Sequence, residues 1–212
     1  MEAKEYDRNY YIGKDSNYIF GYQHLRWKIF WGRRLKILKK VISSGTVLDT
    51  GCAFGFFIKM VERNFQVYGL DISEYATQKA KDIVSKPERI KCYDINKGIP
   101  FERRFDVITA FDFFEHMEDP VTIFNFIDKS LKPNGYFYLE LPFSKTVINR
   151  DIGHYYRPMK IWLHFLSQAG FKPLWIRTYY TVGLRFIMIP TRKFSNYCSI
   201  IAKRKDESEQ NG

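Results

Sequence analysis

The sequence has few cysteines, and they are scattered. Cys52, Cys92 and Cys198 are the three cysteines in 212 residues, and no two of them form a C-x-x-C pair. A disulfide framework or a cysteine zinc site needs paired or clustered thiols, so neither is indicated. Free thiols are typical of a reducing compartment, and the predicted location is cytoplasmic.

The chain also lacks a long apolar segment. No run approaches the roughly 20 residues that a membrane span needs. The first 14 residues are charged and contain no apolar core of a signal peptide. We therefore expect a soluble protein, and peripheral contact with a membrane is left open.

Acidic residues are in the minority. The chain has 34 Lys and Arg against 23 Asp and Glu, a net charge of +11. This charge attracts phosphates, nucleic acid or anionic lipid and does not choose among them. Hydrophobic residues make up 45% and charged residues 27%, which is ordinary for a globular protein, but the aromatic share of 18% is high. We expect these rings to line a large core or an apolar pocket.

Short β-branched or aromatic runs alternate with helical stretches along most of the chain. This alternation predicts an α/β fold with a Rossmann-like, seven-stranded, mostly parallel sheet and helices on both faces. The segment 180–196 contains no helical pattern, so the last strand is expected to pair antiparallel. The predicted strands are 46–49, 66–71, 89–93, 105–111, 135–141, 173–179 and 197–203.

Helix signals divide the rest of the chain. Helices are predicted over 22–42, after Gly55, after an N-cap at Ser73, after Asp119-Pro120, and over 158–169. We expect three parts: an N-terminal cap and helix (1–44), one α/β domain (45–204) and a polar tail (205–212) that is disordered.

A glycine-rich turn follows the first predicted strand. Gly51 and Gly55 frame it, and such a turn lets a ligand approach backbone amides at the start of a helix. Asp71 closes the second strand, where a carboxylate can accept both hydroxyls of an adenosine ribose. The pattern therefore predicts half of a nucleoside site.

The same turn does not match a dinucleotide fingerprint. The G-x-G-x-x-G pattern would need glycine where Ala53 and Phe56 stand. Asp49, at the mouth of the first strand, would repel a pyrophosphate. It favours instead a ligand that carries an ammonium and a sulfonium.

Five segments resemble, in order and spacing, those of class I S-adenosylmethionine-dependent methyltransferases. The resemblance is to the broad group that includes the ubiquinone-biosynthesis O-methyltransferases, and it runs from about Gly45 to Gly170. It implies a methyltransferase with S-adenosylmethionine as cofactor. The matching segments are 47–55, 68–73, 105–109, 115–120 and 131–135.

The resemblance also implies roles for individual residues. The turn from Gly51 to Gly55, with Ala53 at its centre, holds the methionine part; Asp71 binds the ribose and Asp94 the adenine. Ile72, Ile95 and Phe111 line the cofactor pocket. Tyr10 and Tyr11 are candidates for a lid over the cofactor, or simply for a cap on the core.

Two positions depart from the family pattern. Ala53 replaces the middle glycine of the turn, and Asn64 replaces the glycine that usually ends the first helix. Alanine is tolerated at position 53 if its φ is negative, and asparagine accepts the left-handed conformation better than most residues do. Both are interpreted as variants that keep cofactor binding.

Two groups of residues are candidates for the chemistry of methyl transfer. Asp112, Glu115 and His116 are similar to a segment that the ubiquinone-type enzymes use for a metal, and predict a divalent ion such as Mg²⁺; structural support of the loop is the alternative. His154 and His116 are candidate bases for an acceptor hydroxyl. A hydrogen bond within the loop explains His154 equally well.

Two further segments carry basic and apolar residues together. The predicted helix from Arg26 to Lys40 has seven basic residues and no acid, which suits anionic lipid, RNA or a solvated face. The segment 182–194 mixes large apolar residues with three basic ones. It is interpreted as the roof of an acceptor pocket, a membrane contact or a packed connection.

The leading hypothesis is methylation of a small molecule at oxygen, with an acceptor that is hydrophobic, lipid-linked or sugar-like. An RNA or protein methyltransferase is the alternative that the charge supports. The chain lacks the N-P-P-Y, D-P-P-Y and Pro-Cys motifs of several nucleic-acid enzymes. A cofactor-binding subunit without catalysis is a third hypothesis, and the sequence does not indicate an oligomeric state.

Overall fold

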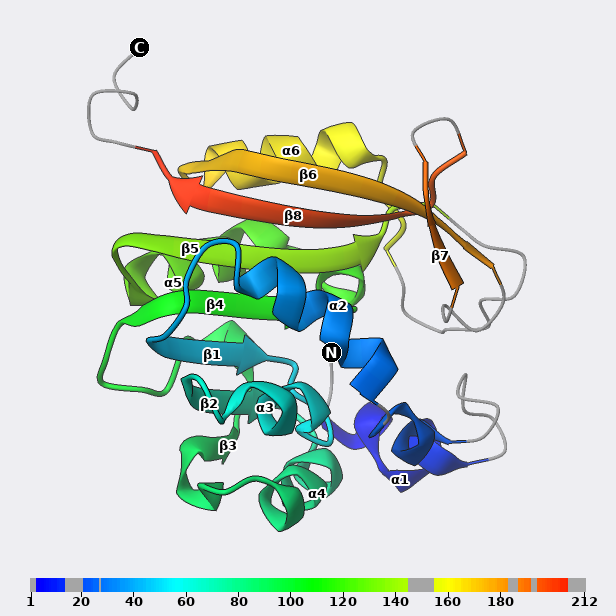
Figure 1. Cartoon of the computed structure of the whole chain (residues 1–212), viewed down its shortest axis with the longest axis vertical. Coiled ribbons are helices and arrows are strands. Elements are labelled where there is room, and N and C mark those ends of the chain that lie inside the picture. Colours follow the sequence, from blue (N-terminus) through cyan, green and yellow to red (C-terminus); the bar gives the residue numbers. More distant parts are fainter. Residues whose placement is uncertain are drawn as a thin grey trace. The chain divides into compact units, whose positions relative to one another are not determined.

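Figure 1 shows a computed structural model of the chain, which describes residues 3–13, 21–26, 28–144, 155–182, 187–191 and 194–205. These residues belong to two compact units, 1–100 and 101–212. The division that the sequence suggests, at 44/45 and 204/205, stays a prediction. Of the predicted tail, all but Lys205 lies outside the described residues.

The first unit contains a parallel sheet with the strand order β3-β2-β1. Its strands are β1 (Thr46–Thr50), β2 (Gln66–Asp71) and β3 (Ile90–Cys92). Its α-helices are α1 (Arg8–Ile12), α2 (Lys28–Leu38), α3 (Phe56–Val61) and α4 (Glu74–Ile83). All five residues of β1 are buried, as expected for a parallel strand with side chains packed on both faces. Helix α3 packs against α2 and α4.

The second unit contains strands in the order β4-β5-β8-β6-β7. Strands β4 and β5 are parallel, and β8 lies antiparallel between β5 and β6. The strands are β4 (Phe105–Phe111), β5 (Leu131–Pro142), β6 (Phe171–Val182), β7 (Ile187–Pro190) and β8 (Tyr197–Arg204). Helices α5 (Pro120–Ser130) and α6 (Met159–Gln168) pack on each other, and they contact β5 and β6 respectively.

The predicted elements are present, with one addition. Each of the seven predicted strands is found, and the expected antiparallel pairing of the last strand is confirmed by β5–β8 and β6–β8. The addition is β7, which pairs antiparallel with β6 inside the segment 182–194, interpreted from the sequence as the roof of an acceptor pocket, a membrane contact or a packed connection. The helix predicted over 22–42 is divided into a 3-10 turn (Tyr22–Arg26) and α2.

The two predicted N-caps are confirmed. The Ser73 hydroxyl accepts a hydrogen bond from the Ala76 amide (3.1 Å) at the start of α4. Asp119 accepts bonds from the amides of Val121 (3.1 Å) and Thr122 (3.4 Å) at the start of α5. These bonds satisfy donors that have no partner within the helix.

The backbone at the two departures from the family pattern differs from what the sequence suggests. Ala53 does not meet the condition of a negative φ, because its φ is 45°, in the left-handed region. Asn64 is absent from the non-glycine residues with positive φ in the described part of the chain, which are Ala53, Asp112 and Asn134. The tight turn thus imposes its geometry on alanine, whereas the end of α3 requires no left-handed residue.

Among the helices in the described part of the chain, none is both long enough and apolar enough to pass through a bilayer.

Candidate functional site

The turn after β1 lies at the edge of the sheet where the parallel strands end. The amides of Gly51 and Cys52 both donate to the Leu70 carbonyl, at 2.9 and 3.0 Å. The Tyr93 amide donates to the Asp71 carbonyl (2.8 Å), which extends the β2–β3 ladder by one residue. The turn, Asp71 and the residues after β3 are therefore gathered at one edge, as the sequence predicts for a nucleoside site.

Asp71 holds the turn in place through its carboxylate. The Ala53 amide donates to Oδ2 (2.8 Å) and the Ser73 amide donates to Oδ1 (2.9 Å). Burial raises the pKa of Asp71, and the hydrogen bonds from the Ser73, Ala53 and Ile72 amides oppose that rise. An ionised carboxylate has about four lone-pair positions, so it can accept hydroxyl donors in addition to these amides.

A second carboxylate adds to the negative charge at the turn. Asp49, on β1, has only 3% of its surface exposed, and Asp71 has 7%. Burial, and then the charges of Asp71 and Asp49, raise the pKa of the Cys52 thiol well above its ordinary value. Both acids therefore act on the same buried point of the turn. Negative charge in this position suits a cationic ligand.

Gly55 shows how closely the turn approaches α4. Its φ is 71°, and a Cβ at this position would lie 2.9 Å from the Ala80 Cβ and 3.3 Å from a Val84 methyl. Gly51 is also left-handed, with a φ of 70°. The glycines of the turn are thus required by conformation at both positions and by space at Gly55.

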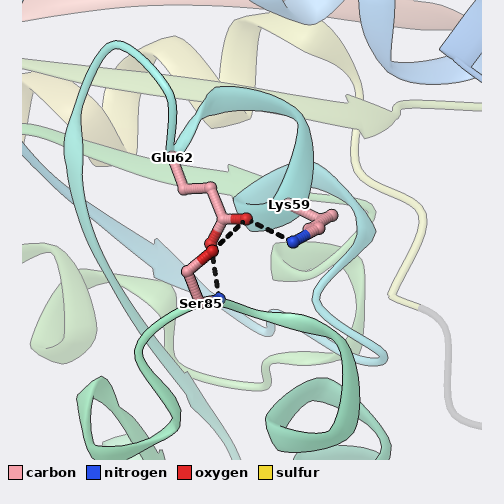
Figure 2. Close-up of polar contacts among 3 residues, drawn as sticks. All are labelled: Lys59, Glu62 and Ser85. Carbon is pink, nitrogen blue, oxygen red and sulfur yellow. Dashed lines mark hydrogen bonds and ion pairs between the residues drawn. The ribbon is translucent and has the colours of Figure 1, made fainter.

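A polar contact ties together the far ends of the two helices that flank the turn. Figure 2 shows Glu62, the C-cap of α3, accepting hydrogen bonds from the Ser85 amide (2.8 Å) and hydroxyl (2.9 Å) just beyond α4. Lys59 pairs with the same carboxylate at 2.7 Å. This contact was not predicted, because Glu62 and Ser85 are distant along the chain.

The predicted adenine-binding residues follow β3. Asp94 is the N-cap of a 3-10 turn (Ile95–Lys97), and its Oδ1 accepts from the Asn96 amide (3.0 Å) and side chain (2.8 Å). Ile95 is 3% exposed, whereas Ile72 is half-buried. Asp94 and Ile95 therefore lie one strand further along the same edge as Asp71.

The N-terminal segment packs directly on the turn. Tyr11, only 4% exposed, lies 5.0 Å from the Phe54 ring and 5.4 Å from the Tyr22 ring, between ring centroids. Tyr22 also contacts Phe54 at 5.0 Å, and Tyr75 lies 5.7 Å from Phe54. The aromatic cap consists of Tyr11, Tyr22, Phe54 and Tyr75. Of these four residues, only Tyr11 was predicted to cover the site, although Phe54 lies inside the turn itself.

A hydrogen bond fixes the N-terminal segment to the start of α4. The Ser73 hydroxyl donates to the Tyr6 carbonyl at 2.5 Å, and the same oxygen caps α4. The Asp7 side chain begins α1 by accepting from the Asn9 amide (2.7 Å) and the Tyr10 amide (3.2 Å). Tyr10 is half-buried and makes an edge contact with Tyr11 at 5.0 Å.

The second unit contains the predicted metal and catalytic residues, and the predicted metal set is not supported. Among the residues that the structure describes, no three His, Cys, Asp or Glu side chains are arranged to hold a metal ion. Glu115 is fully buried, Asp112 takes a left-handed φ of 51°, and His116 is half-buried. The 3-10 turn 114–116 directs Glu115 into the core, so the three side chains do not converge. His154 lies outside the described residues.

A buried polar network lies beside these residues and was not predicted. Glu140, on β5, is 1% exposed, and its Oε1 accepts from the Tyr138 hydroxyl (2.5 Å) and the Ser199 hydroxyl (2.6 Å). Burial, followed by the charges of Glu140 and Glu115, raises the pKa of the Cys198 thiol. Phe111, predicted to line the cofactor pocket, packs on the Tyr138 ring at 4.9 Å. Strand alternation alone does not show that a glutamate stands in this core.

The chain is similar to one known protein family and to several curated proteins. A model of the methyltransferase domain matches residues 22–182. The chain is 31% identical over 111 residues to a ubiquinone biosynthesis O-methyltransferase of Leptothrix cholodnii, covering 50% of this chain and 45% of that protein. It is 32% identical over 142 residues to the mitochondrial ubiquinone biosynthesis O-methyltransferase of Candida albicans, covering 63% of this chain and 41% of that protein. The chain thus spans less than half the length of these curated relatives.

A solved structure extends the likeness to almost the whole chain. The S-adenosylmethionine-dependent methyltransferase of Clostridium acetobutylicum aligns with a TM-score of 0.64 over 93% of this chain and 96% of that chain. The sequences are 14% identical, so this likeness shows the Rossmann-like α/β fold and nothing finer.

Proposed function

Because the chain belongs to the methyltransferase-domain family, we propose that it is an S-adenosylmethionine-dependent enzyme that methylates a hydroxyl oxygen of a small, largely apolar molecule. The observation that carries the proposal is the buried carboxylate of Asp71, which faces the turn through the Ala53 amide. The activity for which the curated relatives are named, O-methylation in ubiquinone biosynthesis, supports oxygen as the methylated atom.

The residues of the first unit fit S-adenosylmethionine. Asp71 accepts the ribose hydroxyls, the turn from Gly51 to Gly55 holds the methionine part, and Asp94 with Ile95 receives the adenine. The negative charge of Asp49 and Asp71 suits the ammonium and sulfonium of the ligand. When bound, S-adenosylmethionine supplies an electrophilic methyl group on a positively charged sulfur.

The chain's own contribution is largely positioning. A direct displacement gains most of its rate from holding the acceptor in line and from excluding water. The aromatic cap is proposed to exclude water from the cofactor site, because Tyr11 and Tyr22 bury the face of Phe54. We propose that Tyr11 closes over the cofactor as part of this cap.

A hydroxyl acceptor also needs a group that takes its proton. We propose His154 or His116 for this role, since a histidine is mostly neutral near pH 7 and can act as a base. Replacing the true base by glutamine should lower methyl transfer about 100-fold or more and leave the affinity for S-adenosylhomocysteine unchanged. If both single variants keep full activity, neither histidine is the base.

The experiment is a transfer assay with methyl-labelled S-adenosylmethionine. The acceptors are simple phenols, phenols with an alkyl chain and monosaccharides, with transfer RNA and denatured protein in separate arms. We expect label in a phenol and a methyl ether by mass spectrometry. Label that appears only in RNA or protein, or on nitrogen, would overturn the proposal in favour of the macromolecular alternative that the charge of +11 raises.

A matched pair of variants ties the activity to the site. Asp71→Asn should abolish transfer, because the amide cannot replace the charge or accept at both positions. Asp82→Asn makes the same chemical change on an exposed side chain of α4, which accepts a hydrogen bond from the Gln78 side chain (3.2 Å), and should leave the rate unchanged. Equal rates in the two variants would show that Asp71 does not bind the cofactor.

A further inference from the structure

The end of the β6–β7 hairpin exposes large apolar side chains. Phe194 is 72% exposed, Ile189 50%, Tyr180 43% and Ile176 41%. Most other large apolar residues of the second unit are buried, including neighbouring Ile200 and Tyr179. An exposed apolar group of this kind, unlike a single exposed residue, points to an interaction surface.

Three of these side chains, those of Ile176, Tyr180 and Ile189, lie on one face of the hairpin. Tyr180 pairs with Ile189 across β6 and β7, so the two side chains project from the same face. Ile176 shares that face, since it stands an even number of residues from Tyr180 on β6 with regular pairing between them. In Figure 1, β7 and the second half of β6 extend beyond the N-terminal end of α6.

The same residues surround a shallow hollow. Tyr180, Ile189, Thr191 and Phe194 line an open cavity of about 420 Å³. The apolar hairpin face is the set Ile176, Tyr180, Ile189, Thr191 and Phe194. It presents protruding side chains around an open hollow.

The surrounding sequence is free of acidic residues. From 152 to 205 the chain contains no Asp or Glu, although the whole molecule has 23 of them. Lys172 and Arg177 are exposed on β6, and Arg192 and Lys193 stand in the sequence between Thr191 and Phe194. The Lys and Arg residues of this stretch are Arg157, Lys160, Lys172, Arg177, Arg185, Arg192, Lys193, Lys203, Arg204 and Lys205.

We propose that the apolar hairpin face docks on the surface of an anionic lipid bilayer. Apolar side chains that enter the boundary of the acyl chains, next to basic residues that attract anionic headgroups, are the combination that holds peripheral proteins on membranes. Each basic residue near such a surface strengthens binding about fivefold. The hairpin thus binds to the membrane without crossing it.

The chemistry of this face favours lipid over other partners. Nucleic-acid backbones are bound by charged and polar groups, and the aliphatic side chains of Ile176 and Ile189 offer none. A second copy of the chain would bring two acid-free, basic stretches together, and like charges across an interface oppose association. Anionic lipid matches both the charge and the apolar surface.

The test is co-sedimentation of the full chain with vesicles. Vesicles of equal parts phosphatidylcholine and phosphatidylglycerol should retain the protein, and vesicles of phosphatidylcholine alone should not. Raising the salt from about 0.1 M to about 1 M shortens the Debye length from about 10 Å to about 3 Å and should weaken retention strongly. The double variant Ile189→Thr/Phe194→Ser should weaken it about tenfold or more, because two large contacts with the acyl region are lost.

Two controls separate docking from folding and from charge alone. Affinity for S-adenosylhomocysteine reports on the first unit and should not change in the double variant, so failure of this proposal is distinct from failure of the methyl-transfer proposal. The α2 variant, Lys36→Ser/Lys39→Ser, removes one exposed charge from α2 and one from the turn directly after it, and should reduce retention less than the hairpin variant does. The proposal is wrong if the anionic vesicles retain no protein, if the α2 variant alone abolishes retention, or if a single-stranded RNA binds through the hairpin face while vesicles do not.

Discussion

Asp71 combines two roles at the scale of a single residue. Its carboxylate fixes the turn through the Ala53 and Ser73 amides, and it is the proposed acceptor for the ribose hydroxyls. Burial raises its pKa while these amides oppose the rise. The charged carboxylate is therefore less stable here than in water, and hydroxyl groups of a bound ligand would stabilise it. The affinity for the cofactor should therefore depend on pH through this group.

The pH dependence has a definite sign. Ligand hydroxyls stabilise ionised Asp71, so the affinity for S-adenosylhomocysteine should be constant above the raised pKa and fall about tenfold per pH unit below it. The fall should begin above pH 3.8, the ordinary value for an aspartate. Calorimetry across the acidic range measures it, with circular dichroism to confirm folding. Asp71→Asn should bind far more weakly at every pH, and any residual affinity that does not change with pH would assign the fall in the original chain to this residue.

Gly55 should be the most sensitive glycine of the turn. Gly55→Ala combines a left-handed alanine with a Cβ placed 2.9 Å from the Ala80 Cβ, and should lower the free energy of unfolding by about 2–4 kcal/mol. Chemical denaturation measures the loss. Gly32→Ala is the control, because its φ is ordinary, its surroundings are open and it lies inside α2. That change should instead raise the free energy of unfolding by up to about 1 kcal/mol.

At the scale of elements, the contact between the ends of α3 and α4 stabilises the frame of the site. Burial by itself would raise the pKa of Glu62, but hydrogen bonds from Lys59 and Ser85 outweigh it and hold the pKa below its ordinary value. Because the folded state favours the carboxylate, the stabilisation is fully present above the ordinary pKa of 4.5 and is lost as the pH falls through the lowered value.

Replacing Glu62 should show this directly. Glu62→Gln removes charge-assisted hydrogen bonds to Ser85 and should lower the free energy of unfolding by about 1 kcal/mol at neutral pH. The difference should shrink in acid, where the original glutamate is also neutral. Lys59→Gln should cost less than about 0.5 kcal/mol, since the Lys59 side chain is 50% exposed. A larger effect from Lys59 than from Glu62 would contradict this view of the contact.

The β6–β7 hairpin shows where sequence patterns fail at the scale of elements. Buried parallel strands such as β1 and β2 appear in the sequence as short apolar runs between helix signals, and they were predicted. β7 is four residues long and ends in proline, and the alternation of exposed and buried positions over so short a length is weak. Its pairing with β6 depends on the tertiary position of β6.

At the scale of the whole molecule, cofactor binding should appear as stability. A ligand that binds only the folded state at about 100 times its Kd stabilises by about 2.7 kcal/mol, which for a chain of this length raises Tm by about 5–10 °C. S-adenosylhomocysteine is the ligand, and differential scanning calorimetry measures the shift. Asp71→Asn should show little or none of it. A folded original chain without any shift would contradict cofactor binding.

The distribution of charge belongs to the same scale. The stretch 152–205 has no acidic residue, and its apolar hairpin face is exposed. By contrast, the proposed cofactor site in the first unit is acidic, with Asp49 and Asp71 buried at the turn. The molecule thus has negative charge where a cationic ligand is proposed to bind and positive charge where an anionic surface is proposed to bind.

The sequence by itself determined the order of strands and helices along the chain and the caps at Ser73 and Asp119. It also determined the turn from Gly51 to Gly55 and the two acids beside it, Asp49 and Asp71. These features depend on neighbours along the chain, where period, capping and turn chemistry act locally. Tertiary structure decided the left-handed conformation of Ala53 and the burial of Glu115, one of the predicted metal ligands. It also decided the Glu140 network and the contact of Tyr11 with Phe54. Those depend on which distant segments meet, because a side chain's exposure and partners are set by packing and not by its place in the sequence.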